Sequence, residues 1–313
     1  MHSSPPPPTA RHVLISLNPK AGAKSGQPAV DRLVELLAAE DLTVEVLTDI
    51  ELLASRSAAL WQANALRCVV AAGGDGTAAL LANRTTPGTP IAILPLGTEN
   101  LLSKHLAIGS DPADVAQTIC TGVVEKFDAG QANGQLFLLM AGCGFDAEVV
   151  RRLHGDRTGH IHHLSYAKPI VDSILNYQYP ELRVSCEVLR DDGQVAPETE
   201  TITCCWAFVV NLPRYAGGLQ IAPRASGNDG LLDVCTFKQG SLWNGLRYLS
   251  GIFFGQHESW DDCVTLRATR VRLESDDAVP YQLDGDPGGQ LPVEIEVLPE
   301  RLTLLVPADA NRQ

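Results

Sequence analysis

The sequence predicts an α/β domain followed by an all-β domain, and three observations carry this prediction. Up to residue 121, apolar runs of strand length alternate with segments of helical spacing. From residue 123 onward the apolar runs are short and are separated by turn residues. A last apolar run at 302–306 again reads as a strand and is expected to return to the first domain. Alternating strands and helices are typical of a parallel sheet, whereas short, closely spaced strands are typical of a sandwich.

The first domain is predicted to contain four strand–helix pairs in order. Its strands are expected at 12–17, 44–47, 68–72 and 91–94, and its helices at 28–40, 51–66, 77–82 and 111–121. Helical spacing of apolar residues supports the helices, as at Leu33, Leu36 and Leu37. This order predicts a Rossmann-like parallel sheet with helices on both faces.

The second domain is predicted to be an antiparallel β-sandwich. Its apolar runs lie at 135–141, 182–189, 201–212, 231–237, 263–273, 279–283 and 291–298. Two helical stretches, near 162–177 and 241–255, interrupt them. The second stretch carries an apolar stripe that we interpret as core, with an acyl-chain pocket as the alternative: Trp243, Leu246, Leu249, Ile252, Phe253 and Phe254.

These patterns predict the domain boundaries. Residues 1–10 contain four consecutive prolines and are expected to be a disordered tail. The α/β domain is expected to comprise 11–128 together with the returning strand 300–307, and the sandwich 129–299.

Four polar turns follow the ends of the four predicted parallel strands. Asn18, Thr48 and Thr98 each come shortly after a strand, and Gly73-Gly74-Asp75-Gly76-Thr77 follows the third strand directly. Ligands bind at the carboxyl ends of the strands in such sheets. The turns are therefore predicted to form one ligand site.

The glycine-rich turn suggests what that ligand is. Gly73, Gly74 and Gly76 allow the backbone to approach a ligand closely, and bare N–H groups where a helix begins bind anionic oxygens. The Asp75 carboxylate would repel a phosphate unless a cation lies between them. The turn therefore predicts nucleotide phosphates with a divalent metal, most plausibly Mg²⁺; the alternative is an ordinary tight turn.

Composition excludes several other classes of protein. The chain has 313 residues, 45% hydrophobic and 19% charged, with a net charge of −13, which argues against nucleic-acid binding. No apolar run is long enough to cross a bilayer, and the start is not a signal peptide. Eight scattered cysteines without metal-binding spacing indicate reduced thiols in a cytoplasmic protein.

Six motifs in order resemble the catalytic domain of the diacylglycerol kinase family, in particular its soluble bacterial lipid kinases, which are related to sphingosine and ceramide kinases. The motifs are Asn18-Pro19 with Gly22, the 73–77 turn, 95–100 (PLGTEN), 142–146 (GCGFD), 228–233 (NDGLLD) and 282–286 (QLDGD). The resemblance covers 11–307. It implies an active site in the cleft between an N-terminal α/β domain and a C-terminal sandwich, with ATP phosphorylating a lipid hydroxyl.

The resemblance also implies roles for individual residues. Gly73, Gly74, Asp75, Gly76 and Thr77 would hold the ATP phosphates, with Asn18, Thr48 and Thr98 lining the nucleotide site. Asp75 would help to hold Mg²⁺, and a second Mg²⁺ would bind Asp229 and the main-chain carbonyls of Ser226 and Leu231.

Asp284 matches the catalytic base of the family, although an Asp-Gly pair is also a common hairpin turn. Where the family commonly has Asp after Asn100, this chain has Leu101; Lys104 stands at a family arginine, and Asp286 at a family glutamate.

A basic, histidine-rich segment over 151–168 offers a membrane-docking or headgroup-binding face, with an ordinary solvated segment as the alternative. The expected partner is a lipid alcohol at a membrane surface, so peripheral membrane association is compatible with a cytoplasmic protein; a homodimer is left open. Two alternatives to a lipid kinase remain: an NAD kinase-like enzyme, and a non-catalytic relative that binds lipid or nucleotide.

Overall fold

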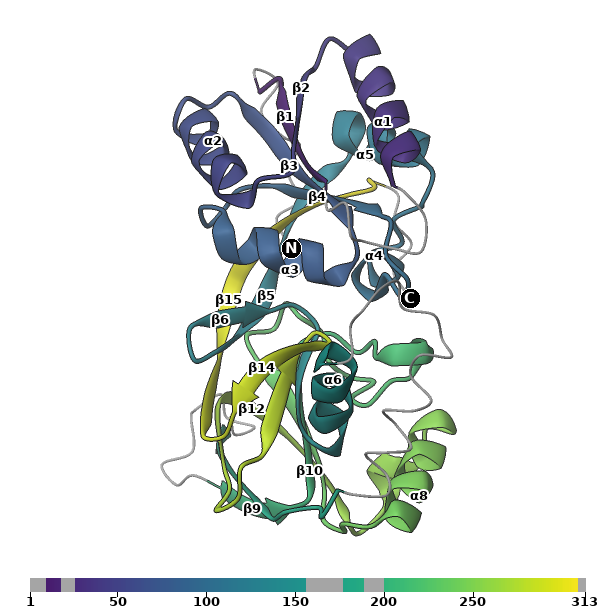
Figure 1. Cartoon of the computed structure of the whole chain (residues 1–313), viewed down its shortest axis with the longest axis vertical. Coiled ribbons are helices and arrows are strands. Elements are labelled where there is room, and N and C mark those ends of the chain that lie inside the picture. The colour runs from purple at the N-terminus through teal and green to yellow at the C-terminus, as the bar shows by residue number, and fades with distance from the viewer. Residues whose placement is uncertain (1–9, 18–25, 156–176, 189–199, 309–313) are drawn as a thin grey trace. The chain divides into compact units, whose positions relative to one another are not determined.

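The computed structural model describes residues 10–17, 26–155, 177–188 and 200–308. The chain forms two compact units (Figure 1). The first comprises Met1–Phe127 and Glu300–Gln313, and the second comprises Asp128–Pro299.

The first unit is a parallel sheet covered by helices. Its elements are β1 (His12–Leu17), α1 (Gln27–Ala39), β2 (Thr43–Leu47), α2 (Ile50–Gln62), β3 (Leu66–Gly73), α3 (Asp75–Arg84), β4 (Ile91–Pro95), α4 (Leu101–His105) and α5 (Pro112–Thr121). The strands lie in the order β4-β3-β1-β2, and all three pairings are parallel. The end of β15 (Val293–Val306) adds to this sheet, because Leu304 pairs with Ile91 in parallel.

Two pairs of helices cover the sheet of the first unit. Helix α1 packs with α5, and α2 packs with α3; Figure 1 shows the two pairs on opposite sides of the strands. Asp49 begins α2 by accepting N–H bonds from Glu51 and Leu52 at 2.9 and 3.1 Å, and Asp111 begins α5 by accepting the Ala113 N–H at 2.8 Å. The predicted parallel sheet with helices on both faces is confirmed.

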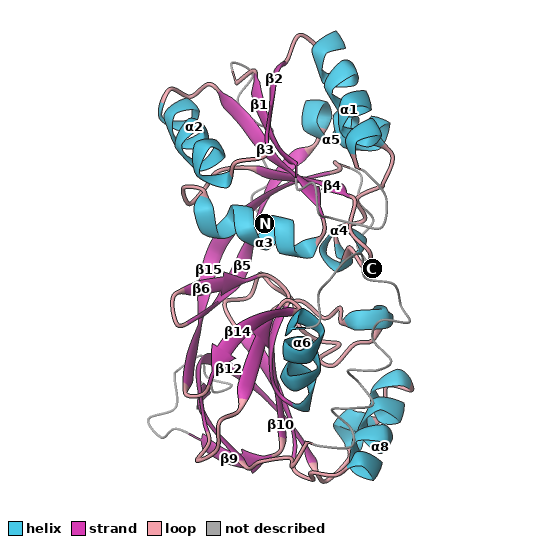
Figure 2. Cartoon of the chain, in the orientation of Figure 1, coloured by secondary structure: helices cyan, strands magenta, loops and turns pink. Residues whose placement is uncertain are grey.

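The second unit is built mainly from antiparallel strands (Figure 2). Its elements are β5 (Val123–Ala132, shared with the first unit), β6 (Gln135–Phe137), β7 (Met140–Gly144), α6 (Phe145–Gly155), β8 (Leu182–Val188), β9 (Glu200–Cys204), β10 (Trp206–Val210), η2 (Ala216–Gly218), β11 (Leu232–Phe237), α8 (Leu242–Phe253), η3 (His257–Ser259), β12 (Cys263–Glu274), β13 (Pro280–Leu283), β14 (Asp286–Gln290) and most of β15.

The strands of the second unit enclose an apolar core. They lie in the order β14-β13-β7-β10-β11-β12, and β12 also pairs with β8 and β15. Side chains from these strands and from β6 fill the core, among them Phe137, Leu232, Leu273 and Val293, each completely buried. The predicted sandwich-like second domain is confirmed.

The structure corrects one interpretation of the sequence. Helix α8 exists as predicted, but of its apolar stripe only Ile252 is buried; the other five residues are exposed. The buried side consists of Gly245, Tyr248, Gly251 and Ile252, so most of the large apolar residues are on the exposed side, and the stripe alone did not show which side faces the core. The predicted helical stretch near 162–177 lies almost entirely outside the described residues.

Candidate functional site

The glycine turn connects β3 to α3 in the first unit. Strand β3 ends at Gly73, and α3 begins at Asp75 with Gly74 in an extended conformation. The Thr77 N–H donates to the Gly74 carbonyl at 2.9 Å, and Thr77 is 4% exposed. A Cβ on Gly73 would overlap the Thr77 side chain, so the turn accepts no larger residue there without moving.

A second turn, after β4, packs directly against the glycine turn. The Leu96 N–H donates to the Gly73 carbonyl at 2.9 Å. A Cβ on Gly97 would lie 2.5 Å from the Gly74 Cα, so the two backbones touch. The Asn100 side chain closes the second turn: its Oδ1 accepts the Gly97 N–H at 2.9 Å, and its Nδ2 donates to the Gly97 carbonyl at 2.8 Å.

Asp75 connects the glycine turn to helix α4. Its two carboxylate oxygens accept the N–H groups of Leu101 and Leu102, each at 2.9 Å. Burial raises the pKa of the Asp75 carboxyl, and these N–H groups together with Lys104 oppose that rise only in part. Leu101 stands where the resemblance led us to expect Asp; it donates its main-chain N–H to Asp75 and its side chain is buried.

The other three residues expected at the nucleotide site differ in where they lie. Thr98 lies in the same turn as Gly97 and is exposed. Thr48 is also exposed and follows β2, which β1 separates from β3 in the sheet. Asn18 lies outside the described residues.

In the second unit, Asp284 lies in the hairpin turn between β13 and β14. Asp284 and Gly285 have φ values of 51° and 86°, as a two-residue hairpin turn requires. Its carboxylate accepts N–H bonds from Leu138, Leu139 and Met140 at 2.6, 2.8 and 3.0 Å. Three donors directed at one side chain require an acceptor, so this geometry suits the ionised carboxylate. The turn and the fixed carboxylate are compatible.

A buried polar network supports that hairpin. Gln282 is 1% exposed; its Oε1 accepts the Gly285 N–H at 2.7 Å, and its Nε2 donates to Asp146 at 3.0 Å. The Tyr215 hydroxyl also donates to Asp146. Burial raises the pKa of Asp146, while these two hydrogen bonds lower it. The motifs at 142–146 and 282–286 contain Asp146 and Gln282, but no local signal pointed to Tyr215.

The predicted metal loop, 226–231, bends sharply, with Gly227 and Gly230 at φ values of 66° and 73°. Asp128 anchors it: its N–H donates to the Gly227 carbonyl at 2.7 Å, and its carboxylate accepts the Gly230 N–H at 2.8 Å. The Asp229 carboxylate accepts the Leu231 N–H at 3.1 Å and forms an ion pair with Arg267.

The carboxylates of Asp229 and Asp233 lie close enough beside this loop for each to feel the charge of the other. Burial raises the pKa of Asp233 to about 6; Arg267 opposes this rise and the charge of Asp229 adds to it. A divalent cation would relieve part of that negative charge. Among the described residues, no group of three or more His, Cys, Asp or Glu side chains could hold a metal ion. A site here would therefore depend on main-chain carbonyls and water, and Arg267 would share Asp229 with the ion.

Comparison with known families covers both units. Residues 12–132 match the family model described as the diacylglycerol kinase catalytic domain. Residues 140–306 match the model described as the YegS C-terminal NAD kinase beta sandwich-like domain. The chain belongs to the diacylglycerol kinase family. The resemblance seen in the sequence is thereby confirmed.

Individual relatives in the diacylglycerol kinase family are moderately similar. A diacylglycerol kinase of Mycobacterium tuberculosis is 32% identical over 249 residues, which is 76% of each chain. A diacylglycerol kinase of Bacillus subtilis is 26% identical over 250 residues, covering 78% of this chain and 79% of the relative. The crystal structure of a putative diacylglycerol kinase from Bacillus anthracis has a TM-score of 0.69 at 23% identity, covering 95% of this chain and 97% of that one, and supports the fold.

Membership of this family indicates the general type of activity. Its members are kinases, so they act on a nucleotide and usually need a divalent metal. None of the helices in the described part of the chain is both long and apolar enough to cross a bilayer.

Proposed function

We propose that the protein is an ATP-dependent lipid kinase that transfers the γ-phosphoryl group to the hydroxyl of diacylglycerol or a related lipid alcohol. The observation that carries this proposal is the Asp284 carboxylate, held by three main-chain N–H groups at the motif position of the family base. Orientation of this kind is what a general base needs before it meets a hydroxyl.

In this proposal the first unit binds the nucleotide. The N–H groups of the 73–77 turn would contact the phosphates where α3 begins. The close contact between Gly74 and Gly97 holds the two turns together and leaves no room for a side chain at Gly97. Asn18, Thr48 and Thr98 would contact the sugar or the outer phosphate oxygens.

The second unit would supply the base. The lipid oxygen forms a bond to the γ-phosphorus while the bond between that phosphorus and the β–γ bridging oxygen breaks, leaving ADP. The hydroxyl proton passes to Asp284. Because phosphoryl transfer passes through a loose transition state, the main task of Asp284 is to orient the hydroxyl and to accept its proton late in the step.

Mg²⁺ would be held by Asp75 and, at a second position, by Asp229 with the carbonyls of Ser226 and Leu231. When bound beside the phosphates, it supplies neutralisation of the negative charge on the transferring group. Asp75 already orders the start of α4, so it would link nucleotide binding to that helix.

The proposal is tested by incubating the protein with γ-labelled ATP, Mg²⁺ and a panel of lipid alcohols in mixed micelles. Labelled phosphatidic acid from diacylglycerol, or the phosphate of another lipid in the panel, is the expected product. Parallel reactions with γ-labelled GTP in place of ATP determine which nucleotide the protein prefers. No labelled lipid from any member of the panel would contradict the proposal and favour a non-catalytic role.

The family model that matches residues 140–306 is described as NAD kinase-like, which supports an NAD kinase as a second candidate function. An NAD kinase would label NAD in a parallel reaction without lipid. Labelling of NAD but of no lipid would replace the first proposal with the second.

A further inference from the structure

Helix α8 presents an apolar face to solvent. Five large apolar side chains on this side are exposed, and we call them the α8 face. They are Trp243, Leu246, Leu249, Phe253 and Phe254, which are 78%, 49%, 46%, 71% and 68% exposed. A contiguous exposed apolar patch of this kind usually marks a surface that binds something.

The α8 face is held outward by close packing on the opposite side of the helix. Tyr248 is 2% exposed, and its ring centroid lies 4.4 Å from that of Phe237. A Cβ on Gly245 would come within 3.0 Å of the Trp206 ring, and one on Gly251 would overlap the Trp260 ring. The inner side is therefore already filled, and the outer apolar side chains have no room in the core.

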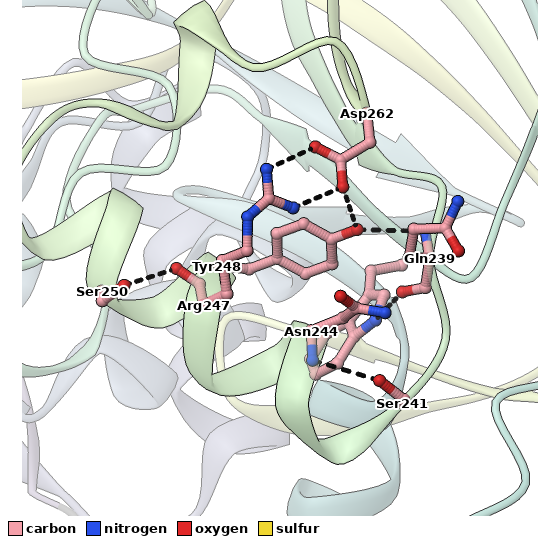
Figure 3. A network of polar contacts seen from close by, with 8 residues as sticks. Gln239, Ser241, Asn244, Arg247, Tyr248, Ser250 and Asp262 are labelled. Atoms are coloured by element: carbon pink, nitrogen blue, oxygen red, sulfur yellow. Dashed lines mark hydrogen bonds and ion pairs between the residues drawn. The ribbon is translucent and has the colours of Figure 1, made fainter.

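A polar network fixes the helix in this orientation (Figure 3). The Tyr248 hydroxyl donates to Asp262 at 2.8 Å and accepts the Gln239 N–H at 3.1 Å. Ser241 begins the helix by accepting the Asn244 N–H at 3.1 Å. Because α8 is anchored at both its start and its middle, the α8 face is a fixed surface.

An ion pair in the same network neutralises the charge of Arg247. Arg247 is the only charged residue in α8, and it forms an ion pair with Asp262 at 2.6 Å. Its guanidinium also lies over the Trp260 ring, 4.1 Å from the centroid. In a chain with a net charge of −13, α8 contains no acidic residue, so its outer side carries almost no net charge.

Size and charge together favour a lipid surface over a protein. A stable protein interface takes about 20–30 residues on each side, whereas the α8 face supplies five. A bilayer requires no matching partner surface, and Trp, Phe and Leu are the residues that the membrane-facing side of an interfacial helix carries.

We propose that the α8 face inserts into the surface of a lipid bilayer. The reason for docking rests on the proposed lipid kinase function, since a lipid substrate resides in such a bilayer. Insertion here is apolar: Arg151 and Arg152 of α6 both pair with Glu148, at 2.7 and 2.6 Å, and the chain is acidic overall. Binding should therefore be at least as strong on neutral as on anionic vesicles and nearly independent of salt.

Vesicle sedimentation tests this proposal with phosphatidylcholine vesicles that contain neither diacylglycerol nor nucleotide. Wild-type protein should bind. The double variant Trp243→Ser/Phe253→Ser should bind at least about tenfold more weakly, because it removes two large apolar side chains that would otherwise leave water. Leu52→Ser on α2, which changes a side chain that is 54% exposed, is the matched control and should bind like wild type.

A second readout does not depend on the double variant folding. Phosphatidylcholine with brominated acyl chains should quench the fluorescence of the wild type, and Trp243→Phe should bind equally but lose most of that quenching. Absence of wild-type binding, equal binding by the double variant, or binding only to anionic vesicles would each overturn the proposal. A dimer in sedimentation equilibrium that Trp243→Ser/Phe253→Ser abolishes would instead assign the face to a second copy.

The vesicles carry no substrate, so this result is independent of kinase activity. A protein that binds vesicles but phosphorylates no lipid would contradict the proposed function alone. A kinase that acts on a water-soluble short-chain diacylglycerol but binds no vesicle would contradict only the docking proposal.

Discussion

Replacing Gly97 with alanine should displace the glycine turn without changing any side chain that is proposed to bind nucleotide or metal. The new Cβ would lie 2.5 Å from the Gly74 Cα, 2.7 Å from the Asn100 Oδ1 and 3.2 Å from the Gly74 nitrogen. Two of these three atoms are backbone, so rotating a side chain cannot relieve the overlap. The two turns must separate by roughly 1 Å to reach an ordinary contact.

The size of the effect follows from that separation. Overpacking of this kind costs about 1–3 kcal/mol of the free energy of unfolding. A misplacement of about 1 Å in a group that positions a substrate can cost about 100-fold in rate. Gly97→Ala should therefore unfold at lower urea concentration and transfer phosphate about 100-fold more slowly at saturating lipid.

Gly134→Ala is the control that distinguishes an effect of lower folding stability from an effect of displacing the glycine turn. Gly134 lies in the turn between β5 and β6 with φ of 87°, and a Cβ added there would meet no atom within 4 Å. Alanine at this position therefore costs only backbone strain, about 1–2 kcal/mol. If Gly97→Ala loses no more activity than Gly134→Ala at a similar loss of stability, the contact between the turns does not position the nucleotide.

Three further outcomes are expected. The pKa of Asp262 is held below its ordinary value of 3.8, chiefly by Arg247, so its ion pair stabilises the fold above that pH and is lost as the pH falls further. Asp262→Asn should lower the free energy of unfolding by about 1–3 kcal/mol at pH 7, and urea titrations should show the difference shrinking below pH 4; a constant difference would contradict the assignment. Arg67 donates to the carbonyls of Ile119 and Cys120 at the end of α5, both at 2.6 Å, so Arg67→Met should cost about 1–3 kcal/mol in urea unfolding, and an unchanged midpoint would refute this role. Chelation with EDTA should abolish phosphate transfer and added Mg²⁺ should restore it; activity that survives chelation would exclude the metal role.

The fold could be predicted from the sequence because its signals are local. Alternating strand and helix patterns in the first half, such as 68–72 followed by the glycine turn, fix the parallel sheet. Helix α8 shows the limit: its period identified the helix, but only the packing of Tyr248 and Gly251 on neighbouring rings determines which side is buried. Periodicity describes one element and cannot show what covers it.

In the candidate site, too, some features could be predicted from the sequence and others could not. The positions of Asp75 and Asp284 were predicted from motifs, and their assigned roles stay predictions. The hydrogen bonds that hold them depend on distant segments: Asp284 is held by N–H groups around residue 139, and the hydroxyl bound to Asp146 comes from Tyr215, 69 positions away. Contacts of such long range leave no pattern in one sequence.

The most direct test of a lipid kinase with Asp284 as its base is the rate of phosphate transfer from ATP to diacylglycerol by Asp284→Asn. Asp276→Asn, which changes an 87% exposed carboxylate of the same unit, is the control, and thermal melting confirms that both variants fold. Asp284→Asn should be slower by about 100-fold or more, with Asp276→Asn at the wild-type rate. Transfer by a folded Asp284→Asn at the wild-type rate would contradict the assignment.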